Sequence, residues 1–290
     1  MQTGVYRSLP FEEYLQIDAV SNSDLGQVKR SPLHYRERVG LDRSKPIVMG
    51  SLVHCGRLEP LTLAERYAVE PEYHKHHENV TAKGDRSSSR ATKYVKDSQS
   101  RFAAANSDKE IVSREWFGEA IKIVTAINNC KESRHALDCN EIELTLVWED
   151  PGTEIVCKAR IDALDRGSHF CDLKTTADLE KFTRSIYSYG YHRQMAHYRE
   201  GWRILTGAEL VPWIVVVESS SPYCVQSAPL AEDTLNEGGR ERRKLLNLIE
   251  KCRKRGDWPG PPSPKYWRIP DWAIDNEPLE VTIGGHTREV

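Results

Sequence analysis

The sequence lacks any long apolar run. No stretch approaches the roughly 18 apolar residues that a membrane-spanning helix requires, and residues 1–7 have no apolar core of the kind that a signal peptide carries. We therefore expect a cytoplasmic protein with no membrane partner. Internal repeats are also missing, and 290 residues suit one large domain or a core with an added lobe.

Paired cysteines are missing as well. The seven cysteines are scattered and none belongs to a CxxC pair, so neither a zinc site nor an iron–sulfur cluster is indicated. In a cytoplasmic protein such cysteines are expected to be reduced and mostly buried as small apolar side chains.

The sequence has no excess of charge of either sign. It contains 41 Lys and Arg against 43 Asp and Glu, which gives a formal net charge of -2. Binding to a polyanion such as DNA would therefore require a local basic surface, because the overall charge neither supports nor excludes it.

Residues 1–135 are expected to form a mainly helical part. Ser21 predicts a helix N-cap, Ser31 followed by Pro32 predicts a second helix start, and residues 50–55 open a third helix. The apolar stripe of that third helix would be Leu52, Val53, Leu58 and Leu61. Residues 73–100 are polar and predict a surface loop that leads into a helix, and residues 116–130 have helical periodicity. The loop contains His74, His76 and His77, for which a solvated loop is favoured over a metal site.

Residues 136–290 are expected to form the core and its tail, within one structural domain overall. From Glu141 the apolar positions alternate, which predicts a half-buried strand. Turns at 151–152 and 166–167 separate it from strands at 155–164 and 169–174, so the three strands predict an antiparallel meander. The remaining elements would be a helix at 187–205, a strand at 213–218, a basic amphipathic helix at 235–255 and a tail rich in Pro and Trp.

Two carboxylates and an amine lie within thirteen positions of the predicted meander. Asp162 ends one strand, and Asp172 and Lys174 lie two apart on the next, so they face the same side while Leu173 faces the other. Carboxylates bind hard divalent cations, and a nearby ammonium can orient a water and balance the charge of a phosphate. On spacing alone, a solvated hairpin in which these charges pair with one another stays open as the alternative.

The surrounding motifs resemble the PD-(D/E)xK nuclease superfamily, and in particular its RecB/RecE-type branch of exonuclease VIII-like, phage and prophage exonucleases. The resemblance is carried in chain order by 50–54, 157–162, 172–176 and the Gln194-x-x-x-Tyr198 pair. Residues 21–23 and 31–35 also resemble the N-terminal region of that branch. The resemblance implies an α/β fold of the α+β type, with a restriction-endonuclease-like core and a central mixed sheet flanked by helices.

The resemblance also implies roles for individual residues. Asp162, Asp172, the Leu173 carbonyl and His54 would be metal ligands, and Lys174 would position the attacking water. Gln194 and Tyr198 share one helix face and would contact the lysine or the DNA backbone. Supporting or DNA-binding positions would be Glu143, Thr175, Arg243 and Lys244. Without the resemblance, His54 reads as a core histidine, Gln194 and Tyr198 as a polar helix edge, and Arg243 and Lys244 as a solvated helix face.

Together these features predict an enzyme, a Mg²⁺- or Mn²⁺-dependent deoxyribonuclease with one or two ions per site and no iron–sulfur cluster. It would resect linear duplex DNA ends for recombination in a bacterial or phage-infected cell. A single-strand annealing recombinase and a homo-oligomeric ring are the partners that the resemblance implies. The alternative is a DNA-binding module of the same fold with little or no catalysis, and a small-phosphoester hydrolase is a weaker third.

Overall fold

A six-stranded mixed sheet forms the centre of the protein. The computed structural model describes residues 1–37, 45–72, 79–80, 86–87, 93–269, 280–283 and 286–289. The strand order is β1-β6-β7-β8-β9-β10, and only β8 and β9 are parallel neighbours within this sheet. The strands are β1 (Gly4–Tyr6), β6 (Glu141–Glu149), β7 (Val156–Asp165), β8 (His169–Thr176), β9 (Val211–Glu218) and β10 (Val225–Pro229). This arrangement confirms the mixed sheet and the antiparallel meander β6-β7-β8.

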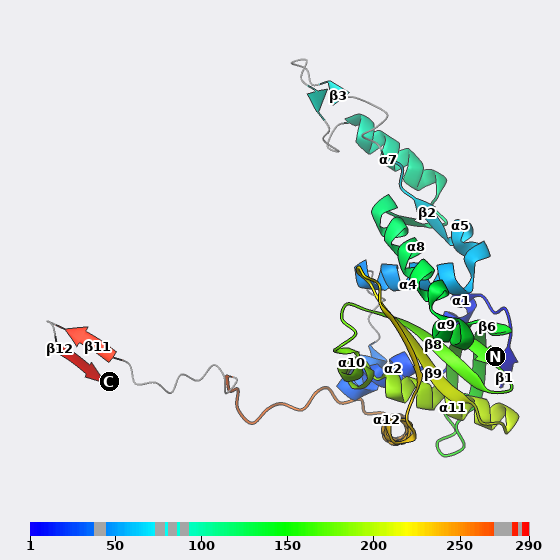
Figure 1. The fold of residues 1–290 in the computed structure, drawn as a ribbon. Coiled ribbons are helices and arrows are strands. Elements are labelled where there is room, and N and C mark those ends of the chain that lie inside the picture. Colours follow the sequence, from blue (N-terminus) through cyan, green and yellow to red (C-terminus); the bar gives the residue numbers. More distant parts are fainter. Residues whose placement is uncertain are drawn as a thin grey trace.

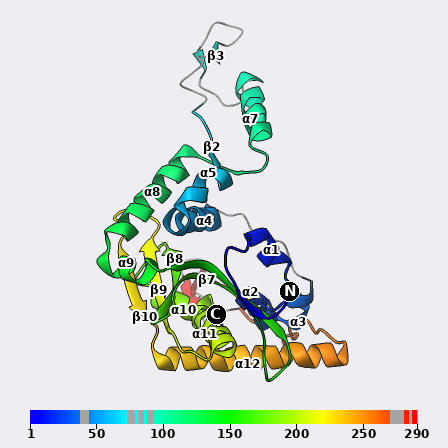
Figure 2. The ribbon, with the colours of Figure 1, turned by 90° about the vertical axis from the view of Figure 1, so that its right-hand side faces the viewer.

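Helices cover both faces of the sheet (Figures 1 and 2). One face carries α4 (Lys45–Leu58), α8 (Arg114–Asn129) and α9 (Lys131–Leu137). The other carries α2 (Asn22–Arg30), α3 (Pro32–Arg36), α10 (Phe182–Ser188), α11 (Tyr191–Thr206) and α12 (Glu232–Arg255). Each face has its own buried apolar cluster, one around Leu52, Ile123 and Val215, the other around Leu25, Trp148 and Leu246. The expected α/β fold is therefore confirmed.

The N-terminal residues belong to the same sheet and core as the later ones. Strand β1 pairs with β6, and α1 (Phe11–Gln16) places Tyr14 against Val147. Helix α2 begins at Asn22 with the predicted Ser21 as its N-cap. The side chains of Ser21 and Asp24 each accept a hydrogen bond from the other's backbone N–H. Helix α3 begins at Pro32 with Ser31 as its cap, as predicted.

Two burial predictions were wrong. Helix α4 begins at Lys45 rather than at Gly50 and ends at Leu58, so Leu61 falls in a separate 3-10 turn, η1 (Pro60–Thr62), with 91% of its surface exposed. Strand β6 is not half-buried throughout, because Val147 faces α1 while Trp148 faces the other way into the core.

The predicted helix at 187–205 is two helices. Gly190 has a φ of +73°, which glycine adopts without steric cost, and it separates α10 from α11. The chain therefore turns between Tyr189 and Tyr191, and this corner lies beside the sheet end that carries Lys174.

A smaller group of elements extends from the α4–α8 side (Figures 1 and 2). It comprises α5 (Leu63–Arg66), β2 (Tyr67–Val69), β3 (Asn79–Val80), β4 (Arg86–Ser87), α7 (Lys93–Ala105) and β5 (Glu110–Val112). Helix α7 is the helix expected at the end of the 73–100 segment, whereas His74, His76 and His77 lie outside the described residues.

Beyond α12 the chain leads away from the sheet (Figure 1). Trp258 packs against Tyr35 with ring centroids 5.7 Å apart, and a hairpin of β11 (Glu280–Ile283) and β12 (His286–Glu289) follows. Across the parts of the chain that the structure describes, no helix combines the length and the apolar character needed to cross a bilayer.

Candidate metal-binding site at a fork in the sheet

The sheet opens where the predicted residues lie. Strand β8 pairs with β9 along its whole length, but its pairing with β7 covers only His169 to Cys171. Beyond that point the Leu173 N–H has no strand partner on the β7 side and donates instead to Asp162 Oδ2 at 2.8 Å. A buried N–H must find an acceptor, so the Asp162 carboxylate fixes the width of the fork between β7 and β8.

His54 connects α4 to two carboxylates at this fork. Its Nε2 lies 2.7 Å from Asp162 Oδ2, and its Nδ1 lies 3.0 Å from Glu143 Oε1. His54 comes from the helix that covers one sheet face, whereas Glu143 and Asp162 come from neighbouring strands β6 and β7. Donor atoms of these three residues lie within 4.8 Å of one another.

Glu143 reaches the site through an irregular backbone. Its φ is +53°, in the left-handed region that non-glycine residues rarely adopt, and the register of β6 with β7 omits the Glu143–Asp162 pair. Such conformations persist only where the surroundings hold them. Here Arg160 pairs with the other Glu143 oxygen, and its guanidinium also donates to the Leu9 carbonyl at 2.8 Å.

Asp172 faces α11 on the other side of the sheet. Gln194 Nε2 donates to Asp172 Oδ1 at 2.6 Å and lies 3.0 Å from the Tyr198 hydroxyl, and Lys174 pairs with Asp172 Oδ2. The resemblance implied that Gln194 would contact the lysine or DNA, whereas in the structure Gln194 holds the carboxylate to which the lysine is paired. The i, i+4 spacing of Gln194 and Tyr198 puts both on one helix face, as expected.

The charges of the fork shift one another's protonation. Burial and the Asp162 charge raise the pKa of Asp172 to about 6, against the opposing effect of Lys174. Burial opposes ionisation of Asp162 and His54 alike, yet their mutual attraction prevails, lowering the pKa of Asp162 and raising that of His54. Burial disfavours the Lys174 ammonium, but Asp172 and Asp162 raise its pKa on balance.

The donor set suits a divalent cation. One imidazole nitrogen and two carboxylates offer the nitrogen and oxygen ligands that Mn²⁺ accepts, and carboxylates alone are preferred by Mg²⁺. The convergence of His54, Glu143 and Asp162 within 4.8 Å is the observation that fits an ion here. Asp172 lies outside that group. The ligand set expected from the resemblance was His54, Asp162, Asp172 and the Leu173 carbonyl. In the structure, Glu143 is the residue that converges with His54 and Asp162.

Glu143 was assigned only a supporting position from the sequence. Its approach to His54 depends on a positive φ, and no residue pattern indicates that conformation. Two further contact residues were not anticipated: Arg160, which holds Glu143, and Tyr191, whose ring centroid lies 4.9 Å from Lys174 Nζ. No sequence pattern indicates the Tyr191 contact, because the break at Gly190 brings that ring to the fork.

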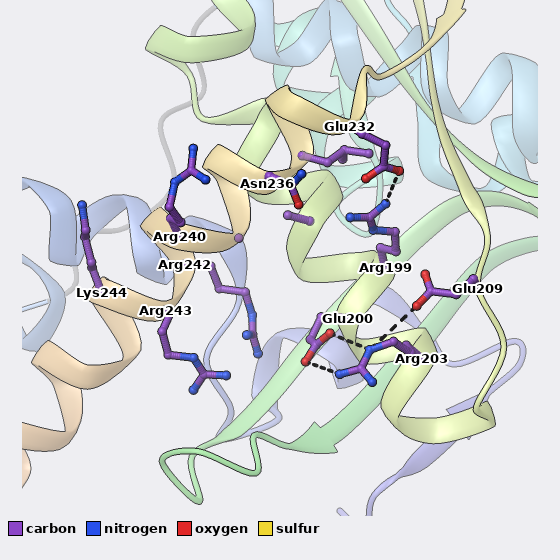
Figure 3. A pocket seen from close by; sticks show the side chains of 13 residues that line it. Arg199, Glu200, Arg203, Glu209, Glu232, Asn236, Arg240, Arg242, Arg243 and Lys244 are labelled. Carbon is purple, nitrogen blue, oxygen red and sulfur yellow. Dashed lines mark hydrogen bonds and ion pairs between the residues drawn. The ribbon is translucent and has the colours of Figure 1, made fainter.

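The other predicted supporting residues make different contacts. Thr175 lies against α4, with its Oγ1 3.7 Å from where a Cβ on Gly50 would stand. Arg243 lines an open hollow of about 840 Å³ between α11 and α12 (Figure 3), where it donates to buried Asp150 at 2.5 Å. Lys244, on the same helix, is exposed.

The hollow itself is largely neutralised by internal ion pairs. Arg199 pairs with Glu232, and Arg203 with Glu200 and Glu209, as Figure 3 shows. Arg243 shares Asp150 with Arg242, which is itself buried. A phosphate contact by Arg243 would therefore have to compete with the Asp150 carboxylate.

Comparisons with known proteins bear on the fold and the family. No curated protein matches the sequence. A solved structure from Eubacterium rectale, named "Putative exonuclease", aligns over 96% of this chain and 97% of that one. The TM-score is 0.59 and the sequence identity is 14%, so the two chains share a fold. Residues 21–263 match the family described as "PDDEXK-like domain of unknown function (DUF3799)". The match spans most of the sequence, so this chain belongs to that family of PDDEXK-like domains.

Proposed function

We propose that this protein is a divalent-metal-dependent DNA exonuclease that hydrolyses phosphodiester bonds at the ends of linear duplex DNA. The observation that carries the proposal is the fork between β7 and β8. There His54, Glu143 and Asp162 converge within 4.8 Å, and the Asp172–Lys174 pair comes from the adjoining strand. Membership of the PDDEXK-like family and the likeness in fold to a protein named as an exonuclease support the same chemistry.

Mg²⁺ or Mn²⁺ bound at the fork would supply Lewis acidity and a bound water of lowered pKa. His54, Glu143 and Asp162 are the residues that would hold it, with Asp172 and the Leu173 carbonyl as further ligands on the β8 side. The Leu173 N–H, which donates to Asp162, holds that carboxylate in place from β8. Arg160 does the same for Glu143 from β7.

Lys174 would place its ammonium beside the attacked phosphate, where it orients the nucleophilic water and balances negative charge. Gln194 holds the Asp172 carboxylate by a hydrogen bond, and buried Tyr198 supports the Gln194 amide. Thr175, Arg243 and Lys244 are assigned to the DNA backbone as part of the proposal.

Replacement of Lys174 tests the proposal. Lys174→Ala is expected to lower the rate of hydrolysis of linear duplex DNA in Mg²⁺ or Mn²⁺ by about 100-fold or more, the usual cost of one charge-stabilising group. Lys181→Ala is the matched control, since Lys181 is an exposed lysine at the start of α10 that pairs with Asp178. Release of nucleotides from end-labelled duplex measures the rate.

Two outcomes would contradict the proposal. If the wild-type protein is inactive with every divalent cation, the proposal that it is an enzyme is wrong. If Lys174→Ala cuts at the wild-type rate, the assignment of the catalytic site is wrong. A covalently closed circular duplex serves as the second substrate, because an exonuclease leaves it intact whereas an endonuclease opens it.

The alternative, a DNA-binding module without catalysis, predicts no divalent-ion binding at the fork by calorimetry. The presence of Asp162, Asp172 and Lys174 together favours the enzyme, since a non-catalytic module has no chemical need for all three. A ring of several copies and an annealing recombinase as partner belong to the proposal, as does a cytoplasmic location.

A further inference from the structure

An aromatic corner lies next to the fork. Tyr187 lies near the end of α10, Tyr189 in the turn and Tyr191 at the start of α11. Tyr187 and Tyr189 keep 64% and 69% of their surface exposed. Large aromatic side chains bury much apolar surface when they pack in a core. Two such rings left in solvent beside a candidate catalytic centre therefore call for a ligand with a flat, stackable face.

Contacts between rings connect this corner to the catalytic lysine. Lys174 Nζ lies 4.9 Å from the Tyr191 centroid, and the Tyr191 and Tyr189 centroids are 5.8 Å apart at an interplanar angle of 43°. Tyr191 is anchored from behind by buried Phe182, with centroids 5.9 Å apart. The aromatic surface thus runs without a gap from the fork to solvent, and Tyr189 is its outermost ring.

The three tyrosines are not equally available. One side of Tyr191 faces the Lys174 ammonium, and Tyr187 lies between His192, at 5.5 Å, and Lys29 Nζ, at 4.9 Å from its centroid. Across the described residues, the ring of Tyr189 contacts Tyr191 alone among aromatic and cationic groups. Tyr189 is therefore the ring with a face free to stack.

The backbone holds Tyr189 in this position. Gly190 follows it with a φ of +73°, and a Cβ there would lie 2.6 Å from Arg193 Nη2. Arg193 is buried and fixed by Asn22, at 2.9 Å, and by Glu241. The Tyr189 N–H also donates to the Ser185 carbonyl at 2.9 Å, and the Gly190 N–H to the Tyr187 carbonyl at 3.1 Å. The backbone of the turn is therefore hydrogen-bonded and presents Tyr189 outward, where the ring is 69% exposed.

We propose that Tyr189 is a stacking platform for the bases of a single-stranded DNA end whose phosphate enters the fork at Lys174. Aromatic rings bind single strands because every base has a π-face, whereas the bases of a duplex are already stacked on one another. The inference rests on the proposed function for the identity of the fork, and it adds that the strand arrives there unpaired. Exposed Arg184, on α10, suits an accompanying phosphate, whereas Lys29, on α2 beside Tyr187, is already paired with Glu241.

Binding to two strands of equal charge tests the platform. The probes are a fluorescent oligothymidylate of roughly 12 nucleotides, within the usual range for such sites, and an abasic strand of the same length. Anisotropy is measured in Ca²⁺ with the full chain. The wild type is expected to bind the thymidylate about 10-fold more tightly, which corresponds to about 1.4 kcal/mol.

The variants separate stacking from other roles of Tyr189. Tyr189→Ala should reduce the 10-fold preference to about 1–2-fold without changing affinity for the abasic strand, because only stacking is removed. Tyr189→Phe keeps the ring and should keep the preference. Tyr266→Ala removes a comparably exposed tyrosine, with 68% of its surface exposed, on the C-terminal tail and serves as the matched control.

Equal affinity of the wild type for the two strands, or no binding to either, would overturn the platform. An unchanged preference in Tyr189→Ala, or a preference lost equally in Tyr189→Phe, would do the same. These results are independent of the nuclease assay. If the protein hydrolyses duplex ends through Lys174 but shows no base preference, the proposed function stands and the stacking platform is wrong. If Tyr189 determines a base preference but the protein hydrolyses no DNA, the stacking platform stands and the proposed nuclease activity is wrong.

Discussion

At the scale of single residues, burial and partners separate side chains of the same type. Asp150 and Asp172 are both buried aspartates at the central sheet. Burial opposes the ionisation of Asp150, yet Arg243 and Arg242 lower its pKa to about 2, whereas burial and Asp162 raise the pKa of Asp172 to about 6. The first is therefore a structural ion-pair partner, while the second pairs with Lys174 and is held by Gln194.

His197 gives a stability test at this scale. It is fully buried, accepts from Arg242 at 3.1 Å and lies 3.2 Å from the Lys158 carbonyl, and burial and the Arg242 charge lower its pKa to about 3. The folded protein thus keeps His197 neutral, while the unfolded chain binds a proton near its ordinary pKa of about 6.5. Stability contributed by His197 is present above about pH 6.5 and is lost as the pH falls.

The expected loss is about 1.4 kcal/mol per pH unit below 6.5, or about 2 kcal/mol at pH 5. Urea unfolding at pH 7 and pH 5 should therefore show the wild type losing about 2 kcal/mol more than His197→Gln. His135→Gln, at an exposed histidine, is the control. An equal loss in wild type and His197→Gln would contradict the assignment.

At the scale of elements, close approach of two helices decides what the sequence tolerates. Helices α11 and α12 cross at Gly238, where an added Cβ would lie 2.2 Å from the His192 carbonyl oxygen. A Cβ added at the adjacent Gly239 would meet no neighbouring group within 4 Å. Two neighbouring glycines in one helix therefore have opposite requirements, and this crossing fixes how α11 presents Gln194 to the fork.

Replacing each glycine with alanine should have opposite effects. Gly239→Ala is expected to stabilise the protein by up to about 1 kcal/mol through helix propensity. Gly238→Ala gains the same propensity but forces the helices apart, for a net loss of about 1–3 kcal/mol. Thermal unfolding of the two variants measures the difference, and similar melting temperatures would show that α11 and α12 do not pack this closely.

At the scale of the whole molecule, the candidate site depends on elements distant in sequence. Helix α4 covers one face of the sheet and brings His54 to Asp162, and α11 covers the other face and brings Gln194 to Asp172. Asp162 and Asp172 lie on the two strands of the fork, β7 and β8. An ion that binds this assembled arrangement and not the unfolded chain must stabilise the fold as a whole.

Mn²⁺ at about 100 times its dissociation constant should stabilise the wild type by about 2.7 kcal/mol, and so raise the melting temperature by several degrees. Glu143→Gln removes one proposed ligand charge with little change of volume and should lose most of this shift. Glu141→Gln, on the same strand but paired with Arg7 and Arg166, should keep it. The same shift in all three proteins would place the ion elsewhere.

The sequence by itself predicted the antiparallel meander β6-β7-β8, the caps at Ser21 and Ser31 and the placing of Asp162, Asp172 and Lys174 on two adjacent strands. Those features follow from local patterns: alternation of apolar residues, side chains that cap nearby N–H groups, and turn residues between strands. The tertiary structure alone decided that Glu143 meets His54, that Arg243 faces Asp150 and that Tyr191 lies against Lys174. Each of these contacts depends on a backbone irregularity or on a charge brought from a distant element, and short-range sequence patterns do not specify either.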